Sequence, residues 1–195
     1  MNTHAPALAS SLGSPSRPGS SGFTLIELLV TIALVATLLA ISLPSMARYV
    51  ASVRLTTASN EFFSALVLAR SEAIKRSSRV VLCKSADGAT CAAAGGWEQG
   101  WIVFDDANDD GVRDADERLI AHRQMLEGGV RMTSNLNVAR YISFTPSGNT
   151  QLVSGAFQAG TVTICRESAS AAPGRQIVLS AVGRPRIRTV ELQSC

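Results

Sequence analysis

The hydrophobic positions follow two different patterns, which divide the chain into a helical first part and a β-rich second part. Residues 23–43 form an apolar run that contains a single charge, Glu27. At 1.5 Å per helical residue this run measures about 30 Å, which is the thickness of a bilayer core. The pattern therefore predicts a helix that spans a membrane. A carboxylate in hydrocarbon is costly, which indicates a functional role for Glu27.

From Pro44 the pattern becomes amphipathic. Apolar residues recur mostly at steps of three and four from Met46 to Ile74, and polar residues occupy most of the positions between them. This spacing predicts that the helix continues to about Arg76, with one apolar face for packing against a sheet. Residues 1–22 are rich in serine, proline and glycine and contain no apolar run, so we do not expect them to fold alone.

The remaining residues, 79–195, are predicted to form a β-rich head. Short β-branched or aromatic runs alternate there with turn residues, including Pro173-Gly174. The fold class that follows is α+β, with one long N-terminal helix packed on one face of an antiparallel β-sheet. Seven strands are expected, at residues 80–83, 100–104, 118–121, 129–132, 141–144, 160–165 and 176–180.

Composition narrows the function classes. The chain has 195 residues, of which 46% are hydrophobic and 17% charged, and a net charge of +3. These values fit a folded domain and exclude a disordered chain or a histone-like basic protein. No set of nucleophile, base and orienting residue is visible, so the sequence predicts no catalytic residues and no enzyme.

The four cysteines are well separated and do not form a Cys-x-x-Cys pair. Because zinc sites need clustered Cys and His ligands, this spacing favours two disulfides in an oxidising compartment. Three connectivities are possible, and four free thiols are the alternative. Pairing each cysteine with its nearer neighbour gives Cys83–Cys91 and Cys165–Cys195.

One loop has the spacing of a calcium site. It follows the pattern D-x-N-x-D-G with a glutamate further on, and calcium is the only cofactor that the sequence suggests. However, an EF-hand has helices on both sides and this loop joins two predicted strands, so a polar hairpin is the alternative. The expected ligands are Asp106, Asn108, Asp110, the Val112 carbonyl, Asp114 and Glu117.

The C-terminal tail concentrates positive charge at Arg175, Arg184, Arg186 and Arg188. If residues 184–188 are extended, the last three arginines share one face. Pro185 favours an edge strand or a loop, which would keep that row accessible. Guanidinium groups in a row suit phosphates, whereas a solvated rim or a protein contact is the alternative.

The residues around Gly22 resemble the type IV prepilin processing motif. The match is Ser21-Gly-Phe-Thr-Leu-Ile-Glu-Leu-Leu-Val30. The resemblance implies that a prepilin peptidase removes residues 1–22 and methylates Phe23. It also implies that Glu27 pairs with the N-terminal amine of a neighbouring subunit. The chain would then be held in the bacterial inner membrane by a single span, with its head in the periplasm.

The order of motifs in the head is similar to that of the GspH/FimT class of minor pilins and pseudopilins. These motifs are Trp101-Ile-Val-Phe104, Ile142-Ser-Phe-Thr-Pro-Ser-Gly148, Thr161-Val-Thr-Ile-Cys165 and Gly183-Arg-Pro-Arg186. The resemblance implies assembly with other major and minor pilins into a pilus or a type II secretion pseudopilus.

Two functional hypotheses follow. The Gly183-Arg-Pro-Arg186 motif is similar to the C-terminal Gly-Arg-x-Arg of FimT-type pilins, which bind DNA for natural transformation. This resemblance predicts non-specific binding of double-stranded DNA, to which Arg70 and Arg76 of the long helix should contribute much less. The alternative is a structural subunit that primes the tip of a pilus or pseudopilus and binds no DNA.

Overall fold

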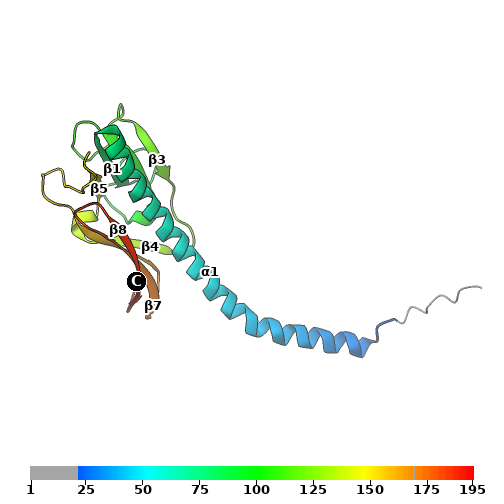
Figure 1. Ribbon diagram of the computed structural model, residues 1–195. Coiled ribbons are helices and arrows are strands. Elements are labelled where there is room, and N and C mark those ends of the chain that lie inside the picture. The colour runs from blue at the N-terminus through cyan, green and yellow to red at the C-terminus, as the bar shows by residue number, and fades with distance from the viewer. Residues whose placement is uncertain (1–21, 169) are drawn as a thin grey trace, which may run out of the picture. The chain divides into compact units, whose positions relative to one another are not determined.

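A computed structural model describes residues 22–168 and 170–195, with the backbone alone at residues 42–45, 47 and 48. In this part of the chain one long helix precedes eight strands and two short 3-10 helices (Figure 1). The helix is α1 (Leu25–Arg76). The strands are β1 (Arg79–Lys84), β2 (Trp101–Asp106), β3 (Leu119–Arg123), β4 (Val130–Ser134), β5 (Tyr141–Phe144), β6 (Gly160–Arg166), β7 (Ala172–Leu179) and β8 (Pro185–Leu192), and the 3-10 helices are η1 (Trp97–Gln99) and η2 (Leu136–Val138).

The chain divides into two compact units, Met1–Pro44 and Ser45–Cys195. The first unit contributes the start of α1, where apolar side chains such as Leu25, Leu29 and Ile41 are exposed. The second unit contains the rest of α1 and all strands. The predicted helix of residues 23–76 is therefore confirmed, and it continues without interruption through residue 44.

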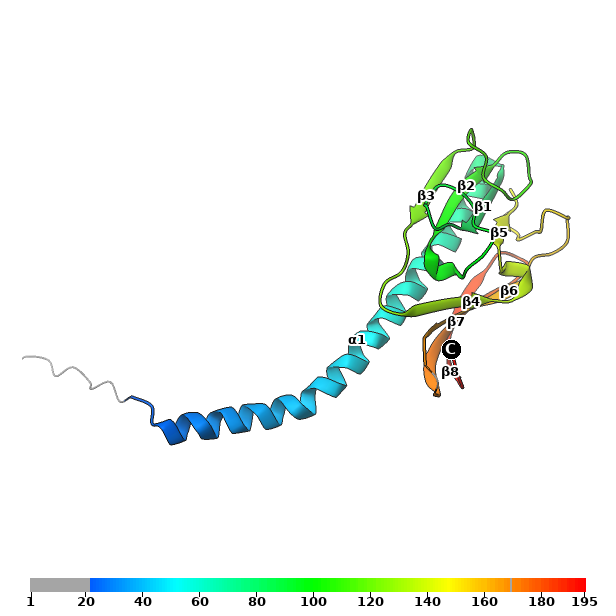
Figure 2. The same ribbon diagram turned by 180° about the vertical axis from the view of Figure 1, so that it is seen from behind.

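The strands of the second unit form two antiparallel four-stranded sheets, in the orders β3-β2-β1-β5 and β4-β6-β7-β8. Figure 2 shows the second sheet from behind, with β8 beside β7 at its edge. The α+β fold class is confirmed. The division of the strands into two sheets follows from their pairing, which the periodicity does not predict.

One apolar face of α1 packs against both sheets, as its spacing predicts. Phe62 contacts Trp97 and Trp101 edge to face, with ring centroids 5.0 and 5.2 Å apart. Phe62 and Leu66 are fully buried in a core that also contains Val103 of the first sheet and Ile164 of the second. This shared core positions the sheet that ends in β8 relative to the second half of the helix.

The predicted turn at Pro173-Gly174 is wrong, because both residues belong to β7. The register shows why proline is tolerated there. The described pairing of β6 with β7 ends at Arg175, so Pro173 pairs with β8 alone, opposite Glu191. A proline interrupts fewer ladder hydrogen bonds where a strand has a partner on one side only. The tail accordingly forms an eighth strand.

Candidate functional site

Two of the tail arginines lie on one face of the edge strand β8. Arg186 and Arg188 are exposed and alternate with the half-buried Ile187, which packs against the core. Arg184 is also exposed and immediately precedes the strand. Its backbone N–H donates to the Ser180 hydroxyl at 3.3 Å, and its carbonyl accepts from the Ser180 N–H at 3.4 Å. The β7–β8 hairpin thus presents three of the four predicted arginines.

Arg175 does not join them. It pairs with Thr189, whereas Arg186 and Arg188 pair with other β7 residues, so strand alternation directs its side chain to the opposite face of the sheet. Its Nη2 donates to the Thr56 hydroxyl of α1 at 2.9 Å. Arg175 therefore lies apart from the other three predicted DNA-binding arginines, at a position that only the register between β7 and β8 determines.

The hairpin arginines carry unpaired positive charge in the part of the chain that the structure describes. Among the described residues, Arg184, Arg186 and Arg188 take part in no ion pair. Glu191 is the next acidic residue in the chain, but alternation places it on the other face of β8. The positive charge of this edge is therefore available to an external anion.

The face beside the arginines is polar. Arg188 contacts Gln176 of β7, and the Gln176 Nε2 donates to the Thr163 hydroxyl of β6 at 3.2 Å. The segments of β6, β7 and β8 contain no aromatic residue on which a base would stack. Guanidinium, amide and hydroxyl groups suit phosphate oxygens, so this surface fits a nucleic-acid backbone better than bases.

Two disulfides hold the head, and both match the predicted pairs. Cys165–Cys195 joins β6 to the C-terminal residue, with Cα atoms 5.9 Å apart, and Cys83–Cys91 links β1 to the following loop, with Cα atoms 5.6 Å apart. The Cys195 N–H also donates to the Ser168 carbonyl at 3.2 Å. The end of the chain beyond β8 is therefore fixed to the sheet.

The start of α1 carries the predicted processing and assembly residues. A β-carbon on Gly22 would meet no other atom within 4 Å, and Phe23 is 83% exposed. The Glu27 N–H donates to the Thr24 hydroxyl at 3.3 Å. Thr24 and Glu27 thus have the spacing of a capping box. This Thr-x-x-Glu signal is present in the sequence. Glu27 therefore takes part in capping the helix, in addition to the assembly role that the resemblance implies.

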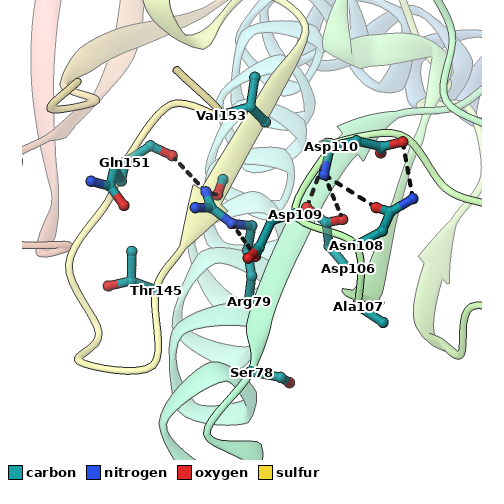
Figure 3. A network of polar contacts seen from close by, with 12 residues as sticks. Ser78, Arg79, Asp106, Ala107, Asn108, Asp109, Asp110, Thr145, Gln151 and Val153 are labelled. Carbon is teal, nitrogen blue, oxygen red and sulfur yellow. Dashed lines mark hydrogen bonds and ion pairs between the residues drawn. The ribbon is translucent and has the colours of Figure 1, made fainter. Parts of the chain in front are cut away.

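Asp106 organises the loop between β2 and β3 (Figure 3). Its carboxylate accepts hydrogen bonds from the backbone N–H groups of Asp110 at 3.1 Å and Gly111 at 3.0 Å. Burial raises the pKa of Asp106 to about 6; the Gly111 N–H opposes this rise, and the nearby Glu117 carboxylate adds to it. This buried carboxyl is the most perturbed group of the loop.

Four other predicted calcium ligands, Asn108, Asp110, Asp114 and Glu117, take part in hydrogen bonds inside the loop. The Asn108 Nδ2 donates to Asp110 at 3.1 Å and to Asp114 at 3.0 Å, and the Val112 N–H donates to Asp110 at 2.7 Å. Glu117 accepts from two backbone N–H groups of the loop. Across residues 22–168 and 170–195 no group of three or more His, Cys, Asp or Glu side chains is arranged to hold a metal ion. Calcium binding stays a prediction.

A cleft of about 580 Å³ lies next to this loop and contains Arg79. The Arg79 guanidinium pairs with Asp109 at 2.7 Å and donates to the Ser143 hydroxyl at 2.6 Å and the Gln151 carbonyl at 3.2 Å (Figure 3). Because these internal partners already pair with the Arg79 guanidinium, the cleft presents less unpaired positive charge to a ligand than the β8 edge does.

Within the described residues, no helix combines the length and the apolar character that crossing a bilayer requires. The structure thus does not confirm the span predicted for residues 23–43, and the side chains of residues 42 and 43 lie outside its described part. Residues 1–21 of the predicted leader also lie outside it.

Comparison with known proteins identifies two sequence matches. Residues 58–183 match the profile described as Type II transport protein GspH, and residues 17–43 match the prokaryotic N-terminal methylation motif. A search of curated proteins gave no significant match.

Two solved structures are similar to this chain. The type IV minor pilin FimU of Pseudomonas aeruginosa PAO1 is 20% identical, with a TM-score of 0.52 over 72% of this chain and 94% of its own. The minor pseudopilin EpsH of the Vibrio cholerae type 2 secretion system is 14% identical, with a TM-score of 0.49 over 69% of this chain and 96% of its own. The likeness to FimU supports a shared fold. Because the GspH profile covers well over half of the residues, the chain belongs to the GspH family and is a minor pilin or pseudopilin of the type IV pilus or type II secretion kind.

Proposed function

We propose that this minor pilin binds double-stranded DNA non-specifically through Arg184, Arg186 and Arg188, as a DNA-uptake component of natural transformation. One observation carries the proposal. The exposed β7–β8 hairpin presents three arginines that have no carboxylate partner among the described residues. Guanidinium forks bind phosphates well, and contacts to phosphates do not distinguish base sequence.

The test is an electrophoretic shift of duplex DNA by the full chain in a neutral detergent. We expect affinity in the micromolar range or weaker, since few phosphates are within reach of three arginines. The slope of log affinity against log salt should be about −2 to −3 if two or three phosphates are neutralised. Arg184→Ala and Arg186→Ala should each weaken binding of all sequences alike. If these variants bind as the wild type does, the proposal is wrong.

We further propose that the chain is made as a prepilin, cut after Gly22 and methylated on Phe23. The start of α1 would then anchor it in the inner membrane, with Ser45–Cys195 in the periplasm, until it joins a filament with other pilins. The methylation motif at residues 17–43 and the exposed apolar side chains of α1 support this route. Changing Gly22 to a bulky residue should leave the precursor uncut by the prepilin peptidase. A normal yield of chain beginning at Phe23 would contradict the proposal.

The second candidate function is structural. Matches to a type II transport family and to minor pilins support assembly rather than catalysis. The hairpin arginines would then meet carboxylates of an adjacent pilin at the filament tip. A chain whose Arg186→Ala variant loses filament incorporation but shows unchanged DNA affinity would favour this candidate.

A further inference from the structure

Arg70, on the long helix, lies beside the β7–β8 hairpin. A β-carbon on Gly183 would come within 3.5 Å of the Arg70 Nε, and one on Gly148 within 3.1 Å. Both glycines have positive φ angles, of 73° and 77°. Residues that have a side chain rarely adopt this backbone conformation, so glycine allows the two turns to close over the same guanidinium.

The two turns are joined to each other. A β-carbon on Gly183 would overlap the Gly148 carbonyl oxygen, which shows how closely the backbones approach. The Thr150 N–H donates to the Ala181 carbonyl at 3.0 Å, and the Thr150 hydroxyl donates to the Ser180 carbonyl at 3.0 Å. Arg70 is therefore held at a fixed place next to Gly183, the residue that precedes the exposed Arg184.

The charge of Arg70 has no counterpart among the described residues. Two other arginines that belong to or contact α1 do pair with carboxylates, Arg76 with Glu72 at 2.6 Å and Arg123 with Glu61 at 2.9 Å. The Arg70 side chain has neither an ion pair nor a hydrogen bond in this part of the chain, and its Nε is buried. Its two terminal nitrogens are not buried, so their N–H groups can meet a ligand.

We propose that Arg70 and Arg184 together form a phosphate-binding notch, in which the helix and the hairpin contact the same anion or adjacent ones. Arg184 directly follows Gly183, beside which the Arg70 Nε lies, and an anion that reaches both guanidinium groups would offset their like charge. The notch rests on the proposed function, since the phosphates would be those of the DNA backbone. It reverses the expectation that Arg70 contributes little, because the packing of the turns brings it to the hairpin.

The test compares neutral and charged replacements of Arg70 in the full chain. Arg70→Gln and Arg70→Met should each weaken binding of duplex DNA several-fold and make the salt slope shallower by about 1, the value for one lost phosphate contact. Arg70→Lys should retain most of the slope but bind more weakly, since lysine keeps the charge without the fork. The methionine variant keeps an aliphatic side chain beneath the two turns. It therefore provides a folded variant without the charge if the glutamine variant does not fold.

Lys75→Gln is the matched control. Lys75 lies on the same helix, and 77% of its side chain is exposed. It follows Arg70 by five residues, so it lies on a different side of the helix from the glycine turns. Lys75→Gln should change the slope much less than Arg70→Met does. If the folded Arg70→Met variant has the slope of the wild type, or changes it no more than Lys75→Gln, the notch does not exist.

Competition with inorganic phosphate tests whether the notch binds phosphate groups specifically, beyond the general effect of salt on DNA binding. Phosphate should displace DNA from the wild type more effectively than chloride at equal ionic strength, and this excess should disappear in Arg70→Met. Equal displacement by both salts in the wild type would contradict the notch. If the wild type binds no DNA at all, the proposed function fails; if it binds and the Arg70 variants match it, only the notch fails.

Discussion

Arg188 and Gln176 face each other across the β7–β8 ladder, and the Nε and Nη2 of Arg188 both donate to the Gln176 Oε1, at 2.9 and 2.6 Å. This contact orients the guanidinium along the sheet without neutralising it. The acceptor is a neutral amide, so the positive charge of the edge is retained.

The first prediction concerns this pair. Gln176→Glu keeps the shape of the side chain but supplies a carboxylate, which should form a cross-strand ion pair with Arg188. Stability should stay unchanged or rise by about 0.2–1 kcal/mol. DNA affinity should fall and the salt slope should become shallower by about 1, because one cation no longer reaches phosphate. Thermal melting and electrophoretic shifts measure the two effects, and an unchanged slope would exclude Arg188 from the interface.

The second prediction concerns the disulfide that ends the chain. Replacing Cys165 and Cys195 together by alanine opens a loop with a sequence separation of 30 residues. In the loop-entropy model this lowers the free energy of unfolding by about 3–4 kcal/mol. Urea unfolding measures the loss, and the matched control is the double alanine variant at Cys83 and Cys91. That control should lose less through loop entropy, since its separation is only 8 residues. Equal stability of the Cys165/Cys195 variant and the wild type would contradict the expectation.

Local patterns predicted most of the fold. The three-and-four spacing of residues such as Phe62 and Leu66 gave the buried face of α1, and alternating apolar runs gave seven of the eight strands in the described part. Such features depend on residues close together in the sequence. For the eighth strand, β8, the sequence predicted only an edge strand or a loop at Pro185.

The site was less predictable, because its geometry depends on contacts between distant segments. Arg175 and Arg186 differ in the face they occupy, and that difference is set by the register between β7 and β8. Arg70 is separated from Gly183 by more than half of the chain, and only the docking of two turns places them together. Neither relationship can be predicted from the spacing of residues along the sequence. The cap at Thr24, by contrast, was visible in the sequence as a Thr-x-x-Glu motif.

The third prediction is a pH dependence that originates at Asp106. Burial raises its pKa to about 6, from an ordinary value of 3.8. Between these values the folded chain holds a proton that the unfolded chain has lost, so stability falls as pH rises through about 6. Relative to Asp106→Asn, the wild type should lose about 2 kcal/mol of unfolding free energy between pH 4 and pH 7. Urea unfolding in a chelating buffer measures this difference, and parallel pH profiles of the two proteins would contradict it.

The fourth prediction tests calcium at the same loop. If the loop binds the ion, added calcium should raise the melting temperature at pH 7, because a ligand that binds only the folded state stabilises it. Glu117→Gln removes the predicted bidentate ligand and should abolish the rise. Magnesium at the same concentration is the control, since it demands a smaller octahedral site. A melting temperature that does not respond to calcium means that the loop is a polar hairpin.

The fifth prediction separates two roles of Glu27. Its N–H donates to the Thr24 hydroxyl, so the residue takes part in the start of α1, whereas its charge is the feature expected to pair with a neighbouring subunit. Glu27→Gln removes the charge but keeps the backbone donor, and it should reduce incorporation into filaments while leaving membrane insertion intact or improved. Thr24→Ala removes the cap, at a cost of about 1 kcal/mol of helix stability, but keeps the charge. It should be incorporated nearly as well as the wild type. Immunoblots of sheared filaments, normalised to the total cellular amount, measure incorporation. A loss in Thr24→Ala as large as that in Glu27→Gln would show that incorporation depends on the start of α1 and not on the charge alone, and normal incorporation of Glu27→Gln would refute the pairing role.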